Sequence, residues 1–124
     1  MRMVLAGCCL LTLSSVARAE PVQLFLHIPA HDERTFDVAA RLGLALMQQG
    51  YEVVDVRPVP IQMSRTTIRF FRPELRGEAE RLKGELEQML HENRIEDGTV
   101  RIQDFTHFRP LPRPGSLELW FRPE

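Results

Sequence analysis

Residues 66–73 read TTIRFFRP, a short apolar stretch that ends at a proline. As a β-strand it places Ile68 and Phe70 on one face and Arg69 and Phe71 on the other, because successive side chains of a strand alternate. One face is purely apolar, and the other combines a charge with a large aromatic ring. We therefore predict that Ile68 and Phe70 pack against helices, and that Arg69 and Phe71 lie on the opposite face of a sheet.

Helices and further strands are predicted on both sides of this stretch. Asp32, or alternatively His31, is suited to cap a first helix, and Gly50 is suited to end it in a left-handed conformation. Pro73 fits the first turn of a second helix. The expected elements are a strand at 22–28, a helix at 34–49, a strand at 51–56, a strand at 66–72, a helix from residue 73, a strand at 99–105 and a short terminal strand at 117–121. We expect one face of the first helix to be formed by Phe36, Ala39, Ala40, Gly43, Leu46 and Met47.

This order predicts the fold class α+β. A β-α-β-β-α-β chain with right-handed crossovers forms a ferredoxin-like sandwich, in which two helices cover one face of an antiparallel sheet. The alternation in LELWF, residues 117–121, predicts an extra C-terminal strand at a sheet edge. The other face of the sheet is then open, and Leu46, Leu82 and Leu86 are expected under Ile68 and Phe70.

The amino terminus has the pattern of a secretion signal. Arg2 precedes an apolar run at 3–13, and Ala17-Arg18-Ala19 forms a small-residue cleavage site. We predict cleavage after Ala19, which leaves a single domain at 20–124 in the periplasm or outside the cell. Leu5-Ala6-Gly7-Cys8 also resembles the lipobox of lipoproteins, but too few apolar residues precede it, so lipidation of Cys8 is the less favoured alternative.

Charge and cysteine content narrow the function classes further. Both cysteines, Cys8 and Cys9, lie in the leader, so the mature chain needs no disulfide framework. Removing Arg2 and Arg18 from 16 basic residues leaves 14 against 17 acidic, a net charge of −3. A nucleic-acid binder is expected to be clearly basic, so this class is excluded.

Four segments resemble one family of envelope proteins. AARLGLALMQQGY (39–51), EVVDV (52–56), TTIRFF (66–71) and GEAERL (77–82) are similar to the C-terminal domain of LytR/CpsA/Psr proteins of bacterial cell envelopes. The resemblance covers about Val22 to Leu90, although IPAHDERT (28–35) replaces the Asn-Gly loop that is usual there. It implies an accessory or binding domain. The phosphotransferase domain of the family is not expected, since only the leader precedes Val22. The peptidoglycan-binding SPOR domain is a neighbour by architecture.

No residue set in the chain predicts a reaction. Ser64 and Ser116 lie outside any nucleophile motif, and the carboxylates of the second helix fit a solvated face. Four histidines have no ligand-like spacing that specifies a metal site: His27, His31, His91 and His107. We therefore expect a non-enzymatic protein without catalytic residues, metal or cofactor.

Arginine and aromatic residues supply the one surface with binding character. Such residues stack on sugar rings and offer planar donors to carboxylates. The predicted partner-binding residues are Arg69, Phe71, Arg72, Arg101 and Trp120, with Arg122 close by in sequence. In an alternative interpretation, the LELWF tail folds over the open face and simply covers Phe71. Two functions follow: a binding module for an envelope glycan or protein, or an assembly subunit whose open face docks on another protein or another copy as a homodimer.

Overall fold

The computed structural model describes residues 20–94 and 99–123. The predicted leader, its cleavage site and Cys8 lie outside these residues. The elements are β1 (Gln23–Pro29), α2 (Glu33–Gln48), β2 (Glu52–Val59), β3 (Thr66–Phe70), a 3₁₀ turn η3 (Pro73–Leu75), α3 (Arg76–Glu92), β4 (Val100–Asp104) and β5 (Ser116–Trp120). The predicted order of strands and helices is confirmed, and Pro73 starts the 3₁₀ turn that leads into α3.

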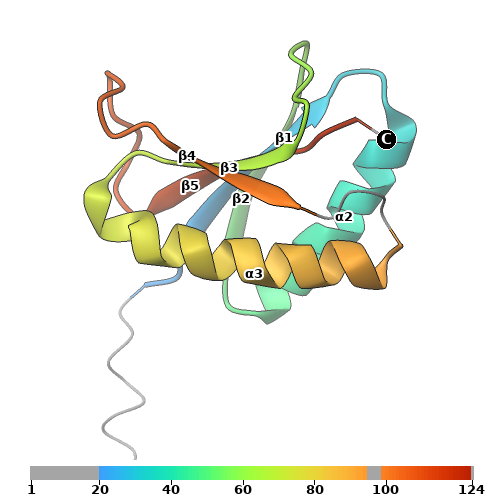
Figure 1. Cartoon of the computed structure of the whole chain (residues 1–124), viewed down its shortest axis with the longest axis horizontal. Coiled ribbons are helices and arrows are strands. Elements are labelled where there is room, and N and C mark those ends of the chain that lie inside the picture. Colours follow the sequence, from blue (N-terminus) through green and yellow to red (C-terminus); the bar gives the residue numbers. More distant parts are fainter. Residues whose placement is uncertain (1–19, 95–98, 124) are drawn as a thin grey trace, which may run out of the picture.

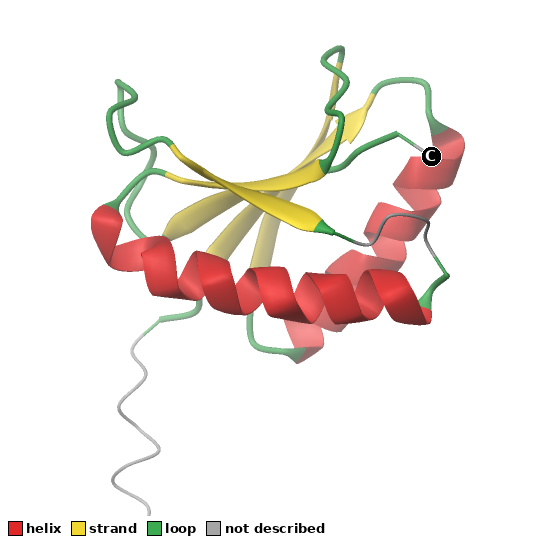
Figure 2. Ribbon diagram, viewed as in Figure 1, coloured by secondary structure: helices red, strands yellow, loops and turns green. Residues whose placement is uncertain are grey.

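The fold has two layers, a five-stranded sheet and a pair of helices on one of its faces (Figure 1). The strand order is β2-β1-β5-β3-β4, and β1 is parallel to both β2 and β5, while β3 is parallel to β4 and antiparallel to β5. Each helix therefore connects two adjacent parallel strands. The loops on the other side of the sheet rise away from the helices (Figure 2).

The coarse class α+β is confirmed, but the ferredoxin-like strand order is not. The sheet is mixed rather than antiparallel, and β5 lies at its centre instead of at an edge. β5 pairs with β1 on one side and with β3 on the other, so it joins the two β-α-β units. Its residues Leu117, Leu119 and Trp120 are buried, as expected for a strand with neighbours on both sides.

The core lies between the sheet and the helices. Ile68 and Phe70 are completely buried there, as predicted. Their neighbours in the core include Leu46 of α2 and Leu82 and Leu86 of α3, the three residues expected under this strand. Phe70 is the largest fully buried side chain, so this half of the prediction from alternation is confirmed.

Helix α2 has the predicted cap and the predicted terminating glycine, although it spans Glu33–Gln48 rather than 34–49, and its buried face differs. Asp32 is the N-cap and accepts a hydrogen bond from the Thr35 amide at 3.1 Å, and Gly50 has a φ of 100°. The buried residues are Thr35, Val38, Ala39, Leu42, Gly43 and Leu46. Of the predicted face, Ala39, Gly43 and Leu46 are buried as expected, whereas Phe36, Ala40 and Met47 are exposed. The reason is that α2 carries a second apolar stripe beside the buried one.

Candidate functional site

The candidate site is the open face, which we define as the sheet surface opposite the helices. Register and alternation place two rows of side chains on it. One row runs from Asp55 through Phe25, Glu118 and Arg69 to Gln103, and the other runs from Arg57 through His27, Trp120 and Thr67 to Arg101. Of the predicted binding residues, Arg69, Arg101 and Trp120 therefore share this face.

Arg69 is held between aromatic rings at the centre of the open face. Its guanidinium carbon lies 4.4 Å from the ring centres of both Phe105 and Trp120. Its Nε donates to Gln103 Oε1 at 2.9 Å. Burial lowers the pKa of Arg69, and Glu118 opposes this effect. Arg69 therefore packs against side chains of its own chain on the open face.

Trp120 also makes contacts within the chain. Its ring stacks on His27 with centroids 4.1 Å apart and planes inclined by 13°, and its Nε1 donates to Glu118 Oε1 at 2.9 Å. Burial lowers the pKa of His27. Trp120 was predicted to offer an exposed ring to a partner. Its ring is instead stacked on His27, and only 8% of the residue's surface is exposed.

Phe71 lies beyond the end of β3 and is covered, although not by the segment that the alternative interpretation proposed. The rings of Phe105 and Phe108, from the loop after β4, lie 5.8 and 6.0 Å from its ring centre. Arg72, next in sequence, donates to the Pro112 carbonyl at 2.9 Å. LELWF cannot cover Phe71 because most of it forms the central strand β5. The loop between β4 and β5 covers it instead.

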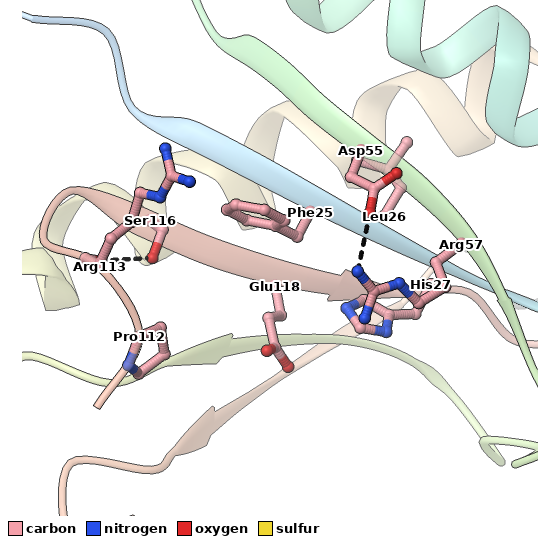
Figure 3. A pocket seen from close by; sticks show the side chains of 9 residues that line it. All are labelled: Phe25, Leu26, His27, Asp55, Arg57, Pro112, Arg113, Ser116 and Glu118. Carbon is pink, nitrogen blue, oxygen red and sulfur yellow. Dashed lines mark hydrogen bonds and ion pairs between the residues drawn. The ribbon is translucent and has the colours of Figure 1, made fainter. Parts of the chain in front are cut away.

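A pocket of about 270 Å³ opens on the other half of the open face, between β1, β2 and β5. Figure 3 shows Phe25 and His27 from β1, and the Asp55–Arg57 ion pair of 3.0 Å from β2. Arg113, from the loop before β5, places its guanidinium 5.9 Å from the Phe25 ring centre. The remaining lining residues are Leu26, Pro112, Ser116 and Glu118.

The prediction from sequence missed this pocket. It selected arginines and aromatics on the strands after residue 66, whereas the pocket lies mainly on β1 and β2. A signal was present in VQLFLHI, because Phe25 and His27 alternate with the buried Leu24 and Leu26. The same alternation puts Asp55 and Arg57 on one face of β2. Only the strand order brings these pairs next to Glu118.

The two serines among the described residues lie in different environments. Ser116 is buried and donates from Oγ to the Arg113 carbonyl at 2.7 Å, and Ser64 is exposed in the connector after β2. Within residues 20–94 and 99–123, no three His, Cys, Asp or Glu side chains gather as a metal site requires. In the same part of the chain neither helix is long and apolar enough to cross a membrane.

Comparison with protein-family models, with curated proteins and with solved structures found no match. The similarity to LytR/CpsA/Psr C-terminal domains therefore rests on segments 39–51, 52–56, 66–71 and 77–82 alone.

Proposed function

We propose that the protein is an exported, non-enzymatic binding domain of the bacterial cell envelope, and that the pocket on its open face binds a small carboxylate-bearing group of the cell wall. The observation that carries this proposal is the set of Arg57, Arg113 and Phe25 around one cavity. Its volume of about 270 Å³ lies just below the usual range for ligand pockets of about 300–1,000 Å³, which suits one amino acid or one sugar ring.

The lining residues favour a ligand with both charges. Arg57 and Arg113 offer planar N–H donors to a carboxylate, and Phe25 offers an apolar wall against which a ring or an aliphatic chain packs. Asp55 and Glu118 lie in the same pocket and suit an ammonium group. A peptide stem of the wall, with free amino and carboxyl groups, has this chemistry.

The envelope location rests on the leader pattern and on the family resemblance. LytR/CpsA/Psr C-terminal domains belong to envelope proteins, and SPOR domains bind peptidoglycan with a similar order of strands and helices. Ser116 is the one serine that lines the pocket, and its hydroxyl already donates to the Arg113 carbonyl, which favours binding over catalysis.

The alternative function is an assembly subunit that docks through the open face. Protein interfaces usually have an apolar centre formed by exposed aromatic residues. Here Phe71 and Trp120 keep only 4% and 8% of their surface exposed. A small polar ligand therefore suits this face better than a protein partner does.

Co-sedimentation with purified peptidoglycan sacculi tests the proposal. We expect the protein to sediment with sacculi, and Arg113→Ala to weaken binding about 10-fold through the loss of a charged donor. Arg34→Ala, which removes an exposed arginine of α2 outside the pocket, is the matched control. Equal binding by all three proteins would locate the site elsewhere, and no sedimentation would contradict wall binding.

Export is tested separately by cell fractionation and mass spectrometry of the recovered protein. We expect a periplasmic or secreted chain whose first residue is Glu20. A lipid-modified Cys8 would support the lipoprotein alternative. Recovery of a cytoplasmic chain that retains Met1 would contradict export.

A further inference from the structure

A second surface, distinct from the open face, exposes apolar side chains where α2 meets the free edge of the sheet. Seven large apolar side chains are exposed among the described residues, and Ile61 and Phe108 are two of them. The other five belong to two neighbouring elements: Phe36 at 55%, Leu44 at 64% and Met47 at 53% exposure on α2, and Val54 at 37% and Val56 at 43% on β2. We call these five residues the α2–β2 surface. Clustered exposure of this kind marks an interaction site.

Two contacts place the apolar stripe of α2 on the β2 side of the helix. Phe36 lines a small apolar pocket together with Pro58 of β2. On the opposite flank, Arg41 donates to Asn93 at the end of α3, with an N···O distance of 3.5 Å. Phe36 and Met47 share one side of the helix and therefore point away from α3 and toward this edge of the sheet, whereas Leu44 lies opposite the buried face and points to solvent.

The edge of β2 still has backbone groups free for pairing. β2 is one of the two edge strands of the described sheet, and β4 is the other. The Val59 carbonyl accepts from the Ala30 amide, so Arg57 and Val59 direct their backbone groups toward the interior of the sheet. Backbone groups alternate along a strand, and those of Val56 and Pro58 therefore face the free edge. Pro58 lacks an N–H, which restricts any added strand to a short ladder near Val56.

We propose that this surface binds a second copy of the chain, through antiparallel pairing of the two β2 strands about a two-fold axis at Val56. In this register Asp55 lies opposite Arg57 of the partner subunit, and the symmetry forms this pair of opposite charges twice. A register centred on Asp55 instead brings two carboxylates together, which is destabilising. Charge therefore selects the axis at Val56.

The position of α2 agrees with the same axis. Leu26 pairs in register with Val56, and Gly43 of α2 lies directly over Leu26, since a Cβ on Gly43 would be 3.8 Å from Leu26 Cδ2. An axis at Val56 is thus level with Gly43 along the length of α2. It turns the Phe36 and Met47 side of α2 toward the same side of the partner helix. The two helices then run antiparallel under a sheet that is continuous across both copies.

Disulfide trapping tests the register most directly. Across the proposed axis the Cα atoms of residue 56 are about 5.5 Å apart, within the range of about 4.4–6.8 Å that a disulfide spans. In a background with Cys8→Ser and Cys9→Ser, we expect Val56→Cys to form a covalent dimer on mild oxidation. Val54→Cys is the control, because its two copies would lie about 14 Å apart. Cross-linking of Val54→Cys but not of Val56→Cys would overturn the proposed register.

Oligomeric state tests the surface itself, by sedimentation equilibrium without any ligand. We expect the wild-type chain to dimerise and Val56→Glu to raise the dimer dissociation constant about 100-fold, since the two new carboxylates would lie opposite one another at the axis. Ile61→Glu makes the same change at a residue with 55% exposure outside the surface and should leave the dimer intact. A wild-type monomer at about 1 mM, where weak dimers still form, would overturn the proposal, as would equal effects of the two variants. Binding of the monomer to lipid vesicles would assign the surface to a membrane instead.

A charge-exchange experiment distinguishes this pairing from other dimers. Asp55→Arg alone and Arg57→Asp alone each place like charges opposite one another, and we expect both variants to be monomeric. When the two variants are mixed, opposite charges face each other again at both positions, so a heterodimer should form. Failure of the mixture to dimerise, while both variants melt like folded protein, would overturn the predicted contact between Asp55 and Arg57. These measurements use no wall ligand, so their outcome is independent of the function proposed for the pocket.

Discussion

The guanidinium of Arg69 lies 4.4 Å from the centre of the Trp120 ring, on the neighbouring strand of the open face. The ring of Phe105 lies at the same distance from it. This stacking joins β3, β5 and the loop after β4. It uses two of the five residues that the sequence suggested for binding, whereas the pocket lies on the other half of the face, between β1, β2 and β5.

Arg69→Lys tests the stacking. Lysine keeps the charge but loses the planar group and the Nε that bonds Gln103, so we expect a loss of about 1 kcal/mol in the free energy of unfolding. Urea melts measure this loss. Arg65→Lys, an exposed arginine just before β3, should change stability little. Equal stability of the Arg69→Lys and wild-type proteins would show that the stacking is not stabilising.

Phe70→Ala and Phe71→Ala compare the two sides of the sheet. Phe70 has no exposed surface and lies in the main core, so its truncation should cost about 3–5 kcal/mol. Phe71 packs against Phe105 and Phe108 under an exposed loop that can collapse around the gap, so we expect a smaller loss of about 2 kcal/mol. Paired denaturant melts decide the order. A larger loss for Phe71→Ala would contradict the assignment of the core to the helix side.

His27 should make stability depend on pH. Burial lowers its pKa in the folded protein below 6.5, so the unfolded chain binds the proton more tightly. The contribution of His27 is therefore complete above about pH 6.5 and declines as pH falls toward the folded pKa. The charged side chains that also act on it are Glu118, Arg57, Arg69 and Asp55.

His27→Phe keeps a ring against Trp120 and removes the titrating group. We expect the decrease in melting temperature between about pH 7.5 and about pH 5.5 to become smaller in this variant. The carboxylates titrate mostly below this window. An unchanged decrease would show that His27 is not the group responsible.

Replacement by alanine should change the stability of the protein in opposite directions at two glycines. Gly50 has a φ of 100°, a conformation that strains any residue with a Cβ, so Gly50→Ala should destabilise the protein by about 1 kcal/mol. Gly84 lies inside α3 with open space around it, and Gly84→Ala should stabilise the protein by about 0.5–1 kcal/mol through helix propensity. Thermal melts measure both changes, and a change of the same sign in both variants would contradict this reasoning.

Several features could be predicted from sequence because they depend on near neighbours in the chain. The Asp32 cap bonds an amide three residues away, and Gly50 terminates a helix through its own backbone conformation. The alternation of Ile68 and Phe70 with Arg69 follows from the geometry of a single strand. The helix α2 shows the limit of this approach, since two adjacent apolar stripes left its buried face undetermined.

The candidate site was predicted only in part. Arg69, Arg101 and Trp120 do share the open face, because period-two alternation assigns each of them to a side of its own strand. The pocket was missed because Phe25, Asp55 and Glu118 become neighbours only through the pairing of three strands. Similarly, the sequence contains Phe105 and Phe108 but does not indicate that they cover Phe71.

By itself the sequence determined the order of strands and helices, the faces of β3 and the ends of α2, because each depends on interactions within one segment or one turn. The tertiary structure decided that β5 lies between β1 and β3, which makes the sheet mixed. Strand alternation specifies which side chains are buried, but it does not specify which strands pair along their edges. Leu117 and Leu119 fit the core equally well beside several partners, and only the packing of both β-α-β units against one central strand selects among them.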